Sequence, residues 1–97
     1  MNMQNLMAQA QRMQRDIMKK KEEVEKKEFV GKSELATVTV NGKKDLVKVE
    51  FAKEVAVDDL EALQDMIVIA TNNANKEVDA AMESAMGQYG SMFNGLF

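Results

Sequence analysis

The chain of 97 residues contains no cysteine, no histidine and no proline. Without cysteine it cannot form a disulfide, a thiolate zinc site or a cysteine nucleophile. Without histidine it lacks the usual acid–base side chain near neutral pH and the commonest metal ligand. Most catalytic arrangements are therefore excluded, and we expect a protein that is not an enzyme and has no cofactor, no metal and no small-molecule substrate.

Long apolar runs are also missing. The longest one, Met66 to Ala70, is far shorter than the roughly 20 residues that a helix needs to cross a bilayer. The first residues do not show the basic stretch followed by an apolar stretch that is typical of a secretory signal. We therefore expect a cytoplasmic protein without a membrane partner.

Charge is unevenly distributed along the chain. The formal net charge is −3, which argues mildly against nucleic-acid binding. However, residues 1–48 carry 11 basic and 7 acidic side chains (net +4), whereas residues 49–97 carry 2 basic and 9 acidic side chains (net −7). This polarisation is a first indication of function, because it makes the amino-terminal half the candidate surface for an anionic partner.

A long helix is predicted over about residues 3–28, where proline and glycine are absent and good helix formers are common. Its apolar residues recur at alternating steps of three and four, which is the spacing of a coiled-coil seam, although Lys20 and Lys27 interrupt it. A methionine-rich stripe of this kind either fills a core or offers an adaptable surface to a partner. The seam consists of Met3, Leu6, Ala10, Met13, Ile17 and Val24.

Strands are predicted in the middle of the chain. Apolar and polar residues alternate over 36–40 and again over 47–51, on either side of Asn41-Gly42, which indicates an antiparallel hairpin. Residues 29–32 could add a third short strand. Because an isolated hairpin is only marginally stable in water, its apolar face must pack on helices or on another chain.

A second helix is predicted to begin at Asp58 or Asp59, where Asp58 and Glu61 resemble a capping box, and to run to about Met86. Gly87 can then supply the left-handed end of the helix. The acidic residues at its start suit the positive end of the helix dipole, or alternatively a divalent cation. The apolar face of this helix consists of Leu60, Leu63, Ile67, Ala70, Ala74, Val78, Ala81 and Ala85.

The expected fold is therefore α+β: a long N-terminal helix, a small antiparallel β-hairpin or three-stranded sheet, and a long C-terminal helix. Residues 1–87 form one domain, and residues 88–97 form a flexible C-terminal tail. A helix of about 26 residues is ~39 Å long, whereas a compact domain of this size has a radius of gyration of ~13 Å. The molecule must be elongated or must project an arm, and either shape leaves apolar surface that favours a homodimer.

Basic residues on the first helix form the candidate binding site. Arg12, Arg15 and Lys19 share one helical face, and Lys26 lies one heptad beyond Lys19. A row of cations is what binding to nucleic-acid phosphates requires. Because residues 12–28 hold seven bases and five interleaved acids, the same face could also be an ordinary solvated surface.

Several sequence strings resemble the YbaB/EbfC family of bacterial nucleoid-associated proteins. They are LMAQAQRMQ at residues 6–14, VTVNG at 38–42 with VEF at 49–51, and DLEALQDMI at 59–67 with NNA at 72–74. Each string is ordinary alone, but together they occur in the order and spacing of the family.

The resemblance implies a tweezer-like homodimer whose long helices project from a β-containing core. It also implies binding to double-stranded DNA in the bacterial cytoplasm, with a role in nucleoid organisation or gene regulation. The alternative function is a protein-interaction module that pairs its helices with a protein partner without direct DNA binding. The family's proposed DNA contacts lie on its helices, which makes Arg12, Arg15, Lys19, Lys20 and Lys26 the expected DNA-binding residues.

Overall fold

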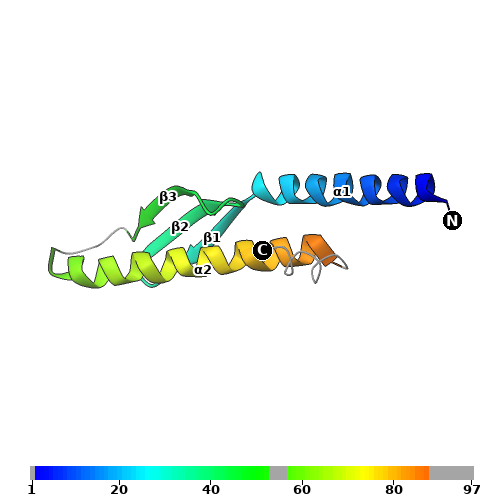
Figure 1. The fold of residues 1–97 in the computed structure, drawn as a ribbon. Helices are drawn as coiled ribbons and strands as arrows, with labels where there is room; N and C mark the ends of the chain where they lie inside the picture. The colour runs from blue at the N-terminus through cyan, green and yellow to red at the C-terminus, as the bar shows by residue number, and fades with distance from the viewer. Residues whose placement is uncertain (1, 53–56, 88–97) are drawn as a thin grey trace.

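The computed structural model describes residues 2–52 and 57–87. Helix α1 extends from one end of a small sheet, and helix α2 lies along one face of that sheet (Figure 1). The molecule measures 70 × 21 × 15 Å, so the predicted α+β class and the elongated shape are both confirmed, with α1 as a projecting arm. The elements are α1 (Met3–Glu25), β1 (Glu28–Lys32), β2 (Ala36–Asn41), β3 (Leu46–Phe51), the 3-10 helix η1 (Val57–Asp59) and α2 (Leu60–Met86).

The sheet is antiparallel with strand order β1-β2-β3, which confirms the predicted third strand. Val38 on β2 lies opposite Gly31 on β1 and Val49 on β3, so these three residues share one face of the sheet. A β-bulge between Thr39 and Val40 shifts the register of β3. This geometry gives the sheet one apolar face and one polar face, as the alternating sequence predicts.

The core lies between the apolar face of the sheet and α2. Alanines on α2 allow the helix to approach the sheet closely, and Gly31 allows the strand to approach the helix. A Cβ atom at Gly31 would overlap the carbonyl oxygen of Ala70 and the backbone nitrogen of Ala74. The buried core consists of Val38, Val40, Ala70, Ala74 and Val78, with Phe29 and Val49 packed against it.

The start of α2 differs from the sequence prediction. The N-cap residue is Asp59 and not Asp58, and the Asp59 side chain makes no capping hydrogen bond, so the predicted capping box of Asp58 and Glu61 is wrong. The reason is that the chain enters α2 through η1, which leaves Asp59 at φ −93° and ψ 0° instead of in the extended conformation of a capping residue. Gly87 is the C-cap residue, as predicted, and has a positive φ of 48°, but its ψ of −119° lies outside the left-handed helical conformation.

Helix α1 begins with a capped first turn, in which the Asn2 side chain accepts a hydrogen bond from the Asn5 amide (2.9 Å). It ends at Glu25, before the predicted end at residue 28, because Glu28 already belongs to β1. Val24 is the only residue of α1 that is buried within the described chain, and Met3 is 76% exposed. The predicted seam is therefore largely uncovered along the arm.

The remaining sequence predictions concern regions and properties outside the sheet. Residues 88–97, the predicted tail, lie outside the described part of the chain. Among residues 2–52 and 57–87, neither helix combines the length and the hydrophobicity that crossing a membrane requires. In the same residues, no group of three or more carboxylates is arranged so that it could hold a metal ion.

Candidate nucleic-acid interface

Three of the predicted binding residues come together on the exposed arm. Arg12, Arg15 and Lys19 line one open concavity on α1, together with Gln9, Met13 and Asp16. At 3.6 residues per turn the three cations lie within a sector of about 60° around the helix axis. Together with Lys26, described below, they are called the cationic row.

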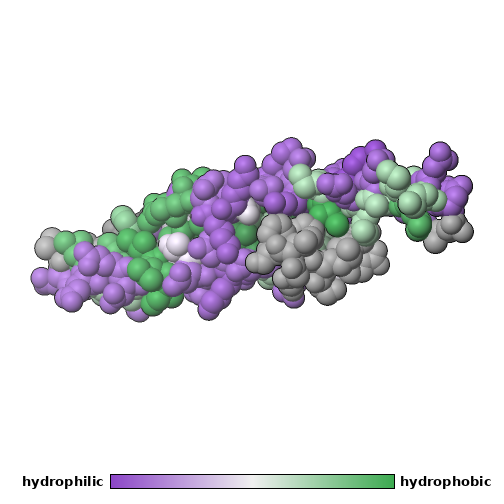
Figure 2. All heavy atoms as spheres, viewed as in Figure 1, coloured by the Kyte–Doolittle hydropathy of each residue, from purple (hydrophilic) through white to green (hydrophobic). Residues whose placement is uncertain are grey.

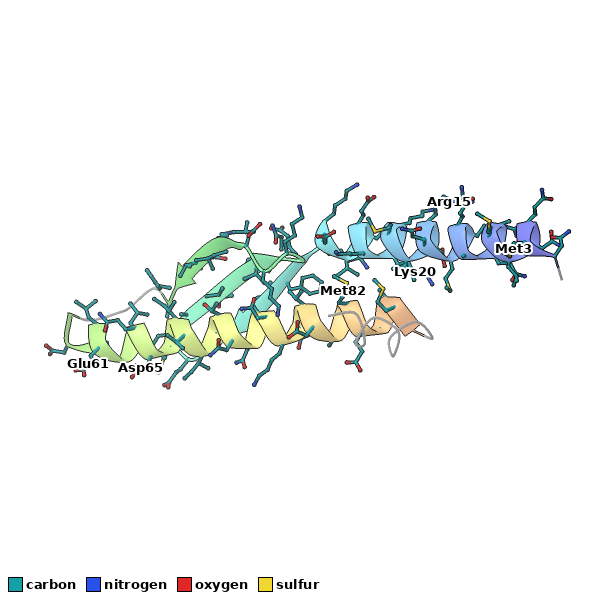
Figure 3. The ribbon with its side chains drawn as sticks, in the orientation of Figure 1. Met3, Arg15, Lys20, Glu61, Asp65 and Met82 are labelled. Carbon is teal, nitrogen blue, oxygen red and sulfur yellow. The ribbon has the colours of Figure 1, made fainter. Side chains whose placement is uncertain are left out.

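Lys20 does not belong to this arrangement. Its Nζ atom lies 3.5 Å from Oδ2 of Asp16, one turn earlier on the helix. Figure 3 shows Lys20 on the side of α1 that faces α2, whereas Arg15 lies on the opposite side. The helical phase explains the difference, because residues 15 and 20 are separated by about 140° around the axis. Sequence reasoning grouped the two residues by charge, and the structure separates them in space.

Lys26 occupies the C-cap position of α1, one heptad after Lys19. It lines a second concavity, between the end of α1 and the β2–β3 turn, with Lys43, Asn41 and three carboxylates. The turn is held there by a hydrogen bond from the Gly42 amide to the Glu25 carbonyl oxygen (3.3 Å). Lys26 therefore continues the cationic row toward the sheet, and Lys43 is a neighbour that the sequence analysis did not select.

The positive charges of the cationic row are available to bind an anionic ligand. In the described part of the chain, no carboxylate forms an ion pair with Arg12, Arg15, Lys19 or Lys26. The far end of the molecule is acidic instead, with Glu61 and Asp65 at the start of α2 (Figure 3). The two ends of the molecule thus differ in charge at these positions, although α1 also carries the carboxylates Asp16, Glu22, Glu23 and Glu25.

Comparison with known proteins assigns the chain to a family. A model of the YbaB/EbfC DNA-binding family matches residues 1–93. The chain belongs to the YbaB/EbfC DNA-binding family. This confirms the resemblance seen in the sequence strings, and it means that the chain belongs to a family of DNA-binding proteins, not to a family of enzymes in general.

Relatives of this YbaB/EbfC chain carry consistent names. A nucleoid-associated protein of Streptococcus agalactiae is 44% identical over 93 residues, covering 92% of this chain and 93% of the relative. A nucleoid-associated protein of Lachnoclostridium phytofermentans is 43% identical, covering 99% of this chain and 88% of the relative. The crystal structure of the uncharacterized Helicobacter pylori protein HP0035 has a TM-score of 0.72 at 22% identity, covering 100% of this chain and 99% of that one, which supports the fold.

Proposed function

We propose that this chain is a nucleoid-associated protein that binds the phosphates of double-stranded DNA through the cationic row, in the bacterial cytoplasm. The observation that carries the proposal is the gathering of Arg12, Arg15 and Lys19 on the exposed arm of a chain from a DNA-binding family. Its role would be the organisation of the nucleoid or the regulation of genes.

The dimensions of the row suit a DNA backbone. From Arg12 to Lys26 the helix rises by about 21 Å, at 1.5 Å per residue. Duplex DNA carries one negative charge per ~1.7 Å of its axis, so an arm lying against the backbone meets several phosphates. Contacts between such cations and phosphates fix position without reading the bases. We therefore expect weak sequence preference and a steep dependence of the affinity on salt.

The proposal includes a homodimer. Helix α2 packs on β1 and β2, whereas apolar side chains remain exposed on β3 and on the neighbouring part of α2. Figure 2 shows hydrophobic residues gathered over this part of the molecule. The exposed apolar residues include Leu46 and Phe51 on β3 and Leu60 and Val68 on α2. Exposed apolar patches of this kind mark interfaces, and a two-fold axis would cover the same patch on both copies. Such a dimer doubles the number of cations offered to DNA.

The DNA contact is tested with the triple variant Arg12→Ala, Arg15→Ala and Lys19→Ala. Binding to a duplex of random sequence is titrated over a range of salt concentrations. The slope of log K against log salt is negative, and each lost phosphate contact should reduce its magnitude by ~0.9, so the triple variant should reduce it by about 2.7 per protomer. The matched control removes three lysines elsewhere, by Lys32→Ala, Lys48→Ala and Lys76→Ala, and should keep the slope of the native protein.

Two outcomes of this titration would contradict the proposal. Equal losses in the triple variant and its control would show that only net charge matters, not the cationic row. A native protein that binds no duplex at low salt would favour the alternative function, a protein-interaction module.

The dimer is tested by sedimentation at micromolar concentration. Phe51→Asp places a charge in the hydrophobic surface between β3 and α2 and should convert the dimer to a monomer without loss of helix signal. Val30→Asp is the matched control, because Val30 is similarly exposed but faces the other side of the sheet. A monomeric native protein, or a dimer unaffected by Phe51→Asp, would contradict this interface.

A further inference from the structure

The β2–β3 turn carries two consecutive lysines in different surroundings. The Lys44 Nζ atom lies 2.8 Å from Oδ1 of Asp79 on α2, so this lysine joins the turn to the helix. In the described part of the chain, by contrast, no carboxylate forms an ion pair with Lys43. Of these two neighbouring lysines, Lys44 is therefore bound within the protein, whereas the positive charge of Lys43 is available to a ligand.

The turn that presents Lys43 has a defined shape. The Asn41 side-chain oxygen accepts hydrogen bonds from the backbone amides of Lys43 (2.8 Å) and Asp45 (3.1 Å). The Lys44 amide donates to the Asn41 carbonyl oxygen (2.9 Å), and the Asn41 amide donates to the Asp45 carbonyl oxygen (3.0 Å). Because these bonds fix the backbone on both sides of Lys43, the direction of its Cα–Cβ bond is also fixed.

The turn is also fixed relative to α1. The Gly42 amide donates to the Glu25 carbonyl oxygen, and a Cβ atom at Gly42 would overlap the Val24 carbonyl oxygen. This close contact places Lys43, the next residue, against the end of the arm, where it lines the same concavity as Lys26. Lys43 therefore extends the cationic row beyond the helix.

We propose that the phosphate-binding surface continues from α1 onto the β2–β3 turn, where Lys43 binds a DNA phosphate beside the one bound by Lys26. The inference rests on the proposed binding of duplex DNA. Glu22, Glu25 and Asp45 also line this concavity, and Asp45 accepts a hydrogen bond from the Asn41 side-chain amide (3.3 Å). These carboxylates weaken the local attraction for phosphate. Because Lys43 adds a single cation, it contributes about one further phosphate contact per protomer. The flexible four-carbon stem of Lys43 allows its ammonium to reach away from them.

The two adjacent lysines provide a matched test. Lys43→Gln and Lys44→Gln each remove one positive charge from the same turn, and circular dichroism verifies that both variants are folded. Their binding to a duplex of random sequence is compared over a series of salt concentrations. Lys43→Gln should reduce the magnitude of the negative slope of log K against log salt by ~0.9 per protomer, whereas Lys44→Gln, which loses only the pair with Asp79, should keep the native slope. Lys43→Arg should also keep it.

The outcomes separate this inference from the proposed function. If the native protein binds no duplex, both fail. In the other case the native protein binds duplex DNA, and the triple variant on α1 shows the expected reduction in the steepness of the salt dependence. If Lys43→Gln and Lys44→Gln then give equal slopes, DNA binding stands and the extension onto the turn is wrong. A less steep salt dependence for Lys43→Gln alone supports the extension.

Discussion

Replacing Gly31 with alanine should destabilise the fold, although alanine is usually more stable than glycine inside a strand. Gly31 is buried in β1, in ordinary extended backbone, and lies opposite Val38. The added Cβ atom would overlap the Ala70 carbonyl oxygen and the Ala74 backbone nitrogen. Because these are backbone atoms in the middle of α2, they cannot rotate away, and the helix itself must move off the sheet.

The size of the effect follows from two opposing contributions. A substitution of glycine by alanine at an unstrained site stabilises a protein by about 0.4–1 kcal/mol, through the entropy of the unfolded chain. Overpacking a well-packed core costs about 1–3 kcal/mol or more. Because the overlap involves rigid backbone, we expect a net loss of about 2 kcal/mol. For a domain of this length each kcal/mol corresponds to roughly 4–8 °C, so the melting temperature should fall by about 8–16 °C.

The assay is thermal unfolding followed by circular dichroism at one fixed protein concentration, because the stability of the proposed dimer would depend on concentration. Lys32→Ala is the control, since Lys32 is the next residue of β1 and is exposed; its effect should stay within about 0.5 kcal/mol. If Gly31→Ala melted at the native temperature or above it, the close approach of α2 to β1 would be refuted.

Three further predictions concern single contacts. Gly42→Ala should lower the free energy of unfolding in urea by about 1–3 kcal/mol, because the turn must separate from the end of α1; an unchanged midpoint would contradict this. Asn2→Ala should reduce helicity at the start of α1, at a cost of about 1 kcal/mol, since the cap to the Asn5 amide is lost; equal circular dichroism at 222 nm would argue against the cap. Asn75→Leu should leave the urea midpoint equal or higher, because the buried side-chain oxygen of Asn75 has no hydrogen-bond partner in the described chain; a large loss of stability would reveal such a partner.

The elements of the fold could be predicted because each has a strong local period. The two-residue period of β2 predicts that Ala36, Val38 and Val40 share a face, and all three are buried. The helical period of α2 likewise predicts the face that includes Ala70 and Ala74, which packs on the sheet. Local periodicity was sufficient in both cases because each apolar face meets the other within the same chain.

The same reasoning could not establish what covers α1. Its apolar seam also follows a helical period, although Lys20 and Lys27 interrupt it, and Leu6 within it remains 46% exposed. A period reports which residues share a face, and it contains no information on whether another element packs there. The position of Lys43 beside the end of α1, where both line one concavity, was missed for a related reason. It depends on the approach of Gly42 to Val24, two residues that are distant in the sequence.

The cationic row also affects the helix that carries it. Arg12 and Arg15 are three residues apart, and Arg15 and Lys19 are four apart, so like charges adjoin on one side of α1, at a cost of about 0.2–0.5 kcal/mol per pair. Because Val24 anchors the arm at its C-terminal end alone, tertiary packing does little to offset this repulsion. Backbone amides near Met3 should therefore exchange with solvent fastest and those near Val24 slowest. Phosphates placed between the cations would remove the repulsion, so the arm would become a more rigid helix on DNA than it is in free solution.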